Sequence, residues 1–208
     1  MKTIFFLRSA KYDYTIPGLD LYDSFNAVIK KEVIPEIIES KDDYLSRLSK
    51  RIRSIPTVFS SPDQRCQKTA AFITKKYREL HFLAEIEYVM EDFITKEAFF
   101  SGGKPQVDLA RKLFVQALIQ NQLRESYTSV LSRIQELQLF LVMSRRSEVV
   151  CISHGFLLKV IEAYFRDPRI VVDPRLLLQY FDGTEQTYAF GKGFRVDFEH
   201  DLVKTSYF

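Results

Sequence analysis

Arginine and histidine side chains follow three apolar runs of strand length in this sequence. Arg8 follows KTIFFL, Arg65 lies five residues beyond TVFS, and His154 follows EVVCIS. A guanidinium can hold a phosphate or carboxylate through two parallel hydrogen bonds, and an imidazole at a strand-to-helix turn can bind phosphate or donate a proton. Taken singly, a structural ion pair or a structural histidine explains each residue at least as well. Brought to one edge of a sheet, the three form a candidate anion site.

The setting of Arg65 adds to this interpretation. Ser61-Pro62-Asp63 has the composition of a helix start, with a capping hydroxyl, a proline in the first turn and then an acid. Arg65 then falls in the first helical turn, where free amides attract anions and the helix dipole disfavours a cation. A bound anion explains an arginine there, and so does an ion pair with Asp63.

An acid for proton transfer is expected after the third strand. Glu91 and Asp92 directly follow the segment 86–90, which has strand character. A carboxyl at a strand end can serve general acid-base chemistry. A solvated acidic pair is an equally good interpretation of the same two residues.

Segments of strand character alternate with segments of helical periodicity. Strands are expected at 2–7, 57–60, 86–90, 148–153 and 194–198, with extended segments at 176–181 and 184–190 joined by a turn at 182–183. Helices are expected over 20–53 with a break at Pro35, over 61–80, 106–119 and 126–143, and from 156 to the residues before 167–168.

This alternation predicts a single α/β domain over residues 1–208. The fold class is a three-layer α/β/α sandwich with a mostly parallel, mixed sheet and antiparallel strands near the C-terminus. Ligands of such sheets bind at the carboxyl ends of the strands, where the three candidate residues lie. The helical segment at about 93–145 is expected to cap the pocket. Its basic residues, Lys104, Arg111, Lys112 and Arg124, are interpreted as a solvated surface.

Composition excludes several classes of function. The net charge of +3 is small and scattered, so nucleic acid is not an expected partner. Cys66 and Cys151 form no paired motif, and no metal or redox cofactor is expected. The N-terminal apolar run is too short for a signal peptide, and no segment has the length of a membrane span. A cytoplasmic protein with buried free thiols is the expectation, and its oligomeric state is open.

The order of these motifs resembles the histidine phosphatase superfamily, the phosphoglycerate mutase-like group. The stretch SSPDQRCQKTA, residues 60–70, agrees closely with the second motif of that family, and SHG, residues 153–155, agrees with a later motif. Glu125-Ser126 with Arg133, and the C-terminal stretch DGTEQTYAF, also resemble family features. The positions that carry the second and later motifs are Ser60, Ser61, Pro62, Arg65, Thr69, Ala70, Ser153, His154 and Gly155.

The resemblance implies roles for individual residues. Arg8, Arg65 and His154 take the positions that hold the transferred phosphoryl group. Glu91 takes the position of the proton-shuttling carboxylate, with Asp92 as the alternative. In the family, a histidine directly after the first arginine is the nucleophile, and a glycine follows it.

Ser9 occupies the nucleophile position, and Ala10 replaces the glycine. An imidazole attacks phosphorus without losing a proton, whereas a serine hydroxyl needs a base. The serine side chain is also shorter, and a misplacement of about 1 Å can cost on the order of a hundredfold in rate. The expected function is therefore a histidine phosphatase-like protein, inactive or impaired, with a phosphate pocket for a phosphorylated small molecule or phosphoprotein.

Two alternatives stay open at this point. One is an active phosphatase or phosphomutase, in which Ser9 acts with His154 as base or water attacks directly. The other is a protein-interaction module whose pocket is vestigial. Lys11 is expected to add to the positive field in the first two cases.

Overall fold

The computed structural model describes residues 1–182, 188–199 and 202–208, which form an α/β/α sandwich. Its described residues contain a sheet of six strands in the order β3-β2-β4-β1-β5-β6. The strands β1 to β4 pair in parallel, and β5 and β6 are antiparallel to their neighbours. The strands are β1 Lys2–Arg8, β2 Val58–Ser60, β3 Tyr77–Glu79, β4 Glu148–Ser153, β5 Gly193–Glu199 and β6 Leu202–Tyr207.

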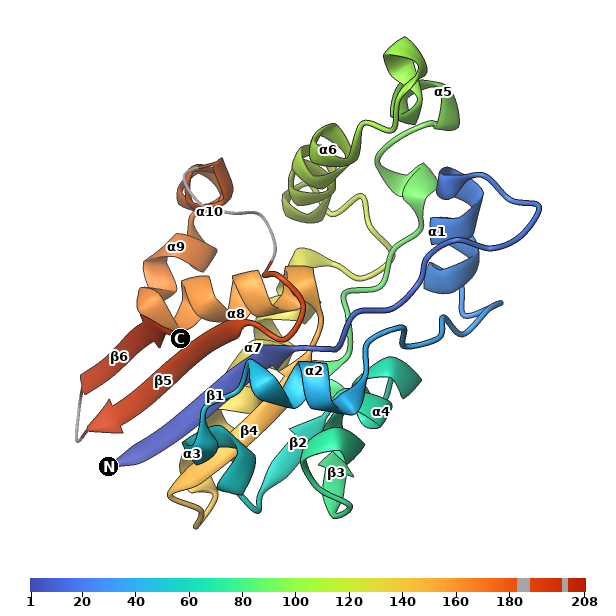
Figure 1. The fold of residues 1–208 in the computed structure, drawn as a ribbon. Coiled ribbons are helices and arrows are strands. Elements are labelled where there is room, and N and C mark those ends of the chain that lie inside the picture. The colour runs from blue at the N-terminus through green and yellow to red at the C-terminus, as the bar shows by residue number, and fades with distance from the viewer. Residues whose placement is uncertain (183–187, 200–201) are drawn as a thin grey trace.

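Helices lie on both faces of the sheet (Figure 1). The α-helices are α1 Leu21–Ile29, α2 Lys41–Ser46, α3 Lys50–Ser54, α4 Gln64–Ile73, α5 Lys96–Phe99, α6 Val107–Ile119, α7 Tyr127–Met143, α8 Gly155–Arg166, α9 Pro168–Val172 and α10 Pro174–Asp182. Short 3-10 helices are η1 His81–Leu83, η2 Met90–Asp92 and η3 Ser101–Gly103.

Alternating residues of the central strands divide the core into two layers. Phe6 of β1 and Cys151 of β4 pack into the cluster with α6, α7 and α8. Leu7 and Ile152 point the other way, into the cluster with α2, α3 and α4. Because side chains alternate across a strand, a run that is apolar at every position is buried on both faces. This explains why the sequence pattern located β1 and β4.

A third, smaller cluster lies beyond the carboxyl ends of β1 and β4, where α1, α5 and α6 stand apart from the sheet (Figure 1). It joins Tyr22 of α1 to Met90 of η2, Phe99 of α5 and Ala110 of α6. The Tyr22 hydroxyl donates to the Ile94 carbonyl oxygen at 2.9 Å. These contacts fix the segment after η2 to α1.

Several element predictions are confirmed, among them the helices α6, α7 and α8 and the strands β2 and β5. The helix expected over 20–53 is wrong: it is three short helices, each begun by a capping side chain, Asp20, Ser40 and Ser49. The helix over 61–80 ends at Ile73, and the remainder forms β3.

Two predicted extended segments are also wrong. Residues 86–90 form no strand, and 176–181 belong to helix α10, whose Leu177 and Phe181 are buried four residues apart on one helical face. Of the expected turn at 182–183 and extended segment at 184–190, residues 183–187 lie outside the described residues. Asp182 ends helix α10, and 188–190 form no strand.

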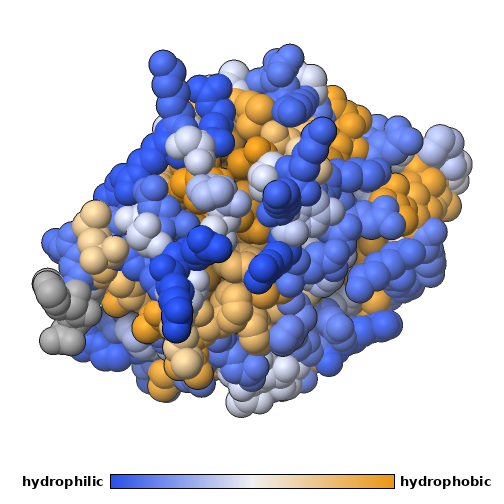
Figure 2. Space-filling model, turned by 90° about the horizontal axis from the view of Figure 1, so that it is seen from below, coloured by the Kyte–Doolittle hydropathy of each residue, from blue (hydrophilic) through white to orange (hydrophobic). Residues whose placement is uncertain are grey.

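The surface is mainly hydrophilic where Figure 2 shows it, with hydrophobic atoms visible between long polar side chains. Scattered apolar exposure of this kind is ordinary for a globular protein. Within the described part of the chain, none of the helices has the length and apolarity needed to cross a membrane.

Candidate phosphate site

The sheet topology brings the three motif residues to one edge. Arg8 is the last residue of β1 and lies beside Ser153 of the parallel strand β4. Ser60, the last residue of β2, pairs with Ile152 of the same strand. Parallel pairing therefore places the residues after β1, β2 and β4 together, as the sequence predicted.

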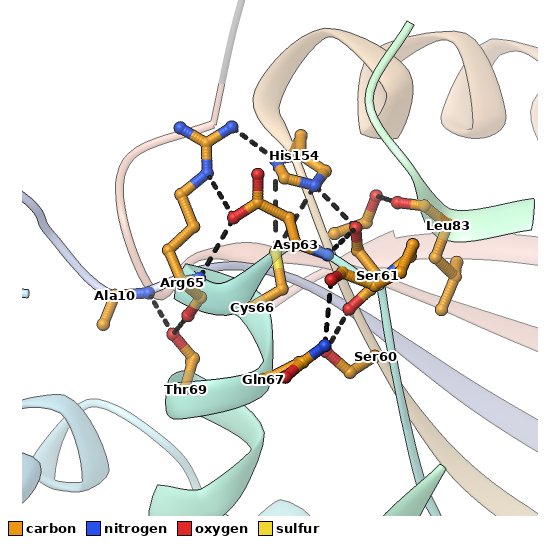
Figure 3. A network of polar contacts seen from close by, with 12 residues as sticks. Ala10, Ser60, Ser61, Asp63, Arg65, Cys66, Gln67, Thr69, Leu83 and His154 are labelled. Atoms are coloured by element: carbon orange, nitrogen blue, oxygen red, sulfur yellow. Dashed lines mark hydrogen bonds and ion pairs between the residues drawn. The ribbon is translucent and has the colours of Figure 1, made fainter. Parts of the chain in front are cut away.

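Arg65 and His154 are in direct contact (Figure 3). The Arg65 Nη2 atom lies 2.9 Å from His154 Nδ1, and His154 Nε2 lies 2.8 Å from the Ser61 Oγ atom. Because a guanidinium can only donate, Nδ1 accepts and the ring carries its proton on Nε2. The proton on Nε2 then points to the Ser61 hydroxyl, which also accepts from the Asp63 amide at 3.2 Å.

The imidazole of His154 is buried and uncharged. Burial, followed by the charges of Arg65 and Arg8, lowers the pKa of His154 well below its usual value. The side chain is only 3% exposed. A neutral imidazole that already accepts from an arginine is a hydrogen-bond donor through Nε2, and a poor base for a neighbouring hydroxyl.

Arg65 is oriented by contacts on three sides. Its Nε lies 3.2 Å from an Asp63 carboxylate oxygen, and its guanidinium lies over the Tyr12 ring, 4.5 Å from the centroid. Desolvation acts against the charge, but the neighbouring Tyr12 and Asp63 keep the pKa of Arg65 above its ordinary value. The alternative of an Asp63 ion pair is thus realised, and the opposite edge of the guanidinium reaches His154.

Arg8 is held from the C-terminal side of the domain. Its Nη1 atom donates to the carbonyl oxygen of Tyr188, and its guanidinium lies 4.0 Å from the centroid of the Phe190 ring. Stacking on an aromatic face fixes the plane of the guanidinium while leaving its edge available for an anion.

Ser9 lies in the same cavity as the two arginines but is only 2% exposed. Its hydroxyl has no hydrogen-bond partner among the described residues. Ala10 is fully buried, and its amide donates to the Thr69 Oγ1 atom at 3.0 Å. Thr69 in turn donates to the Arg65 carbonyl oxygen at 2.7 Å, so the second motif anchors the strand-end turn.

Cys66 lies beneath the imidazole, with its Sγ atom 3.5 Å from His154 Nε2. Burial raises the pKa of this thiol far above its ordinary value. A buried, protonated thiol is a poor nucleophile, so the contact is a packing contact.

A carboxyl that the sequence analysis did not select lies in the cavity wall. Glu85 Oε1 accepts from the Leu157 amide at 3.1 Å and from the Ile86 amide at 3.2 Å. Oε2 has no partner in the described part of the chain. Removal from water raises the pKa of Glu85, against the charge of Arg65 and the two amide hydrogen bonds. A raised pKa beside an anion site is typical of a proton donor.

The structure does not bring Glu91 together with Arg8, Arg65 and His154. Its carboxylate is half exposed and lies 3.3 Å from Lys30 Nζ. Asp92 accepts from the Val89 amide at 2.9 Å. Neither residue is part of the cavity wall. The true third strand, β3, ends at Glu79, and Glu85 follows it after one 3-10 turn. The rule of an acid after the third strand would have selected Glu85 if β3 had been located.

These residues surround a cavity of about 680 Å³. One end holds Arg8, Arg65, His154 and Glu85, and the walls come from α1, α6, the segment 84–90 and the start of α8. Arg111 and Arg124, interpreted from sequence as solvated, also line this cavity. Lys11, expected to add to the field, is exposed and is not part of the wall. The volume is within the range of ligand pockets, roughly 300–1,000 Å³.

A family model and several solved structures match this chain. The model of the histidine phosphatase superfamily (branch 1) matches residues 42–171. Among curated proteins, no sequence matches the chain.

Solved structures of several phosphatases share the fold over the full length of the chain. A mycobacterial glucosyl-3-phosphoglycerate phosphatase with VO3 superposes with a TM-score of 0.65 at 16% identity, covering 100% of this chain and 97% of that chain. A putative alpha-ribazole-5'-P phosphatase from Escherichia coli gives 0.61 at 13% identity, with coverage of 100% and 96%. A mutant phosphoserine phosphatase from Entamoeba histolytica, bound to phosphoserine, gives 0.60 at 14% identity, with coverage of 100% and 96%. The likeness is one of fold, phosphoglycerate mutase-like throughout.

Proposed function

Because the chain belongs to branch 1 of the histidine phosphatase superfamily, we propose that it binds phosphate monoesters between Arg8, Arg65 and His154 and is impaired in their hydrolysis. The observation that carries the proposal is the site itself. Two guanidinium groups line one cavity beside the buried imidazole of His154, whose Nε2–H donates to Ser61, and Ser9 stands there at the nucleophile position.

We call Arg8, Arg65 and His154 the clamp. These residues suit the binding of a phosphate dianion better than they suit the activation of Ser9 as a nucleophile. His154 Nδ1 is occupied by Arg65 at 2.9 Å, and its lowered pKa makes it a weak base for Ser9. Without a base, a serine hydroxyl is a poor nucleophile at neutral pH. Helices α5 and α6, within the cap-like segment at about 93–145, would close the cavity over a small phosphorylated ligand. The buried free thiols of Cys66 and Cys151 suit a reducing cytoplasm.

One observation favours residual hydrolysis as a second candidate. Glu85 faces the cavity with a raised pKa and an unused Oε2. In a water route, water adds to phosphorus, the ester P–O bond breaks, and Glu85 gives its proton to the leaving alkoxide. The proton lost by the attacking water then restores Glu85.

Calorimetry with inorganic phosphate and orthovanadate, together with turnover of p-nitrophenyl phosphate, tests the proposal. We expect both anions to bind wild type, Arg65→Met to weaken binding at least tenfold, and turnover to stay below the usual enzyme range of about 1 to 1,000 per second. Arg51→Met is the matched control, because Arg51 pairs with Glu148 at 2.6 Å on the surface, away from the cavity.

Each alternative gives a different result. Turnover within the usual range that is lost in Arg8→Ala would overturn the proposed impairment. Slow turnover abolished by Glu85→Gln supports the water route, and a phosphoryl group found on Ser9 by mass spectrometry supports the serine route. Absence of anion binding in a folded protein supports a vestigial pocket. Ser9→His with Ala10→Gly asks whether restoring the nucleophile restores turnover.

A further inference from the structure

The cavity continues from the phosphate clamp into a region of apolar walls. We call this region the apolar annex. It is built mainly from the third hydrophobic cluster, which α1, η2, α5 and α6 share. The members of the apolar annex are Phe25, Ile29, Met90, Phe93, Phe99 and Val107.

An unbroken series of aromatic contacts connects the clamp to the annex. Arg65 lies over Tyr12, whose ring centroid is 4.6 Å from that of Tyr14. Tyr14 meets Phe25 edge to face at 4.9 Å, and Phe25 meets Phe99 at 6.3 Å. Four rings thus form one wall, starting at the guanidinium that would hold the phosphate.

A second series of aromatic contacts also lines the cavity. Phe156, two residues after His154, stacks on Phe114 with centroids 4.0 Å apart. Tyr88 packs edge to face on the same Phe114 at 4.8 Å, and Phe93 lies 5.9 Å from Tyr88. Of these rings, Tyr88, Phe93 and Phe156 line the cavity. A ligand held at the clamp therefore has two series of aromatic side chains within the same cavity.

The size of the cavity shows that phosphate alone does not fill it. Water takes roughly 30 Å³ per molecule, so about 680 Å³ corresponds to on the order of twenty water molecules. Placing an apolar group against these aromatic side chains releases such water at a gain that grows with the apolar area covered. A hydroxyl-rich group in the annex loses its water without hydrogen-bond partners on the apolar side chains that build the annex.

We infer that the organic part of the ligand is a large apolar or aromatic group, and that this chain prefers aryl phosphate monoesters over phosphates of small polyols. The inference rests on the proposed function, because the clamp must hold the phosphate for the annex to receive the remainder. Lys30, Lys31, Arg111 and Arg124 complete the wall. Such cations attract the dianion toward the cavity before it binds.

Calorimetric titration with four probes tests the inference: inorganic phosphate, glycerol 3-phosphate, 1-naphthyl phosphate and 1-naphthol. We expect 1-naphthyl phosphate to bind at least tenfold more tightly than inorganic phosphate or glycerol 3-phosphate. Phe25→Ala should remove most of that advantage and leave the affinity for inorganic phosphate within about twofold. Phe100→Ala is the matched control, since Phe100 is a partly buried phenylalanine of the same cluster that does not line the cavity.

A second variant covers the case in which Phe25→Ala does not fold. Val107→Phe places a larger side chain in the annex and reduces the space there. It should weaken the affinity for 1-naphthyl phosphate and leave the affinity for inorganic phosphate unchanged. Equal affinity for all three phosphates would overturn the preference and leave the clamp intact. Failure of every phosphate to bind would count against the clamp, and so against the proposed function. In that case, binding of 1-naphthol that is weakened by Phe25→Ala would show that the annex alone still receives an aromatic group.

Discussion

Two buried polar clusters, one around Glu162 and one around Arg8 and Arg65, differ in how their charges are balanced. In one, Glu162 is fully buried and accepts from Lys159 Nζ at 2.8 Å and from Arg166 Nη2 at 3.1 Å. The hydroxyls of Tyr188 and Tyr207 donate to the same carboxylate. Every oxygen of this anion is therefore used within the protein, as buried charge requires.

The clamp has the opposite arrangement. Arg8 has a carbonyl oxygen and an aromatic ring as partners, and Arg65 has the carboxylate of Asp63 and a neutral histidine. Glu85 lies at the same end of the cavity and feels both arginine charges, but among the described residues its hydrogen bonds come from the Leu157 and Ile86 amides and not from a guanidinium. The Glu162 cluster therefore has its own central anion hydrogen-bonded to every cation, whereas the two guanidinium groups of the clamp share no such anion among the described residues.

Tyr188 belongs to both clusters. Its hydroxyl donates to Glu162, and its backbone carbonyl accepts from Arg8. The structural cluster thus holds the residue that orients one arm of the clamp. Substitutions in the two clusters should nevertheless have separable effects, one set on unfolding and the other on anion binding.

The largest effect is expected for Glu162→Ala. Removing one partner of a buried ion pair strands Lys159, and such changes cost about 3–5 kcal/mol of unfolding free energy. Urea unfolding followed by circular dichroism measures the loss. Glu91→Ala is the control, because Glu91 pairs with Lys30 at the surface, where an ion pair contributes about 0–1 kcal/mol. A loss as small as the control's would mean that Glu162 is not the structural anion.

Arg65→Met should act mainly on phosphate affinity and less on the unfolding free energy. Methionine keeps much of the packing on Tyr12, but the charged donor is lost, and hydrogen bonds to charged groups contribute about 1.5–3 kcal/mol. Affinity for inorganic phosphate should fall roughly 10- to 150-fold. Unfolding free energy should fall by about 1–3 kcal/mol, less than for Glu162→Ala, because the buried His154 Nδ1 atom loses its donor.

The matched substitution in the other cluster is Arg166→Met. Arg166 donates to Glu162 and lies outside the cavity. It should lower the unfolding free energy and leave phosphate affinity unchanged. Equal effects of the two arginine substitutions on phosphate binding would end the distinction between the clusters.

The neutral state of His154 predicts a pH dependence of stability. The unfolded chain gains a proton on this histidine below about pH 6.5, whereas the folded chain resists it because the pKa is lowered. More protons bound in the unfolded state mean that unfolding free energy falls with decreasing pH, by at most about 1.4 kcal/mol per pH unit. Urea midpoints of wild type and His154→Gln between about pH 5 and 7.5 measure it. A wild-type slope that His154→Gln retains in full would assign it to other groups.

The fold could be predicted where burial and periodicity agreed. β1 and β4 are apolar on both faces, and α6, α7 and α8 carry long helical stripes, so local pattern and tertiary packing point to the same element. β3 has three residues, of which Arg78 and Glu79 are exposed, and only its pairing with β2 makes it a strand. No periodicity can reveal such a strand.

The site residues could be predicted where the sequence located the strand that precedes them. Arg8, Arg65 and His154 meet because parallel strands bring their carboxyl ends together. Glu85 was missed because its selection depended on β3. The apolar annex was missed because α1 and α6 are separated by some eighty residues of sequence, and the cavity between them follows from tertiary packing alone.

The smallest effect is expected for Ser9→Ala. In the Glu162 cluster each tyrosine hydroxyl that points to the carboxylate is used as a donor, whereas the Ser9 hydroxyl has no partner in the described residues. If Ser9 is only what remains at the nucleophile position, its loss should change inorganic phosphate affinity by no more than about twofold, since the charged donors dominate. Calorimetry on Ser9→Ala beside Ser61→Ala measures this, because Ser61 accepts from His154 at 2.8 Å and its loss should disturb the imidazole more. If Ser9→Ala weakens the affinity for inorganic phosphate tenfold or more, the Ser9 hydroxyl is itself a phosphate ligand. Ser9 would then be a working part of the clamp and not only the remainder of a lost nucleophile.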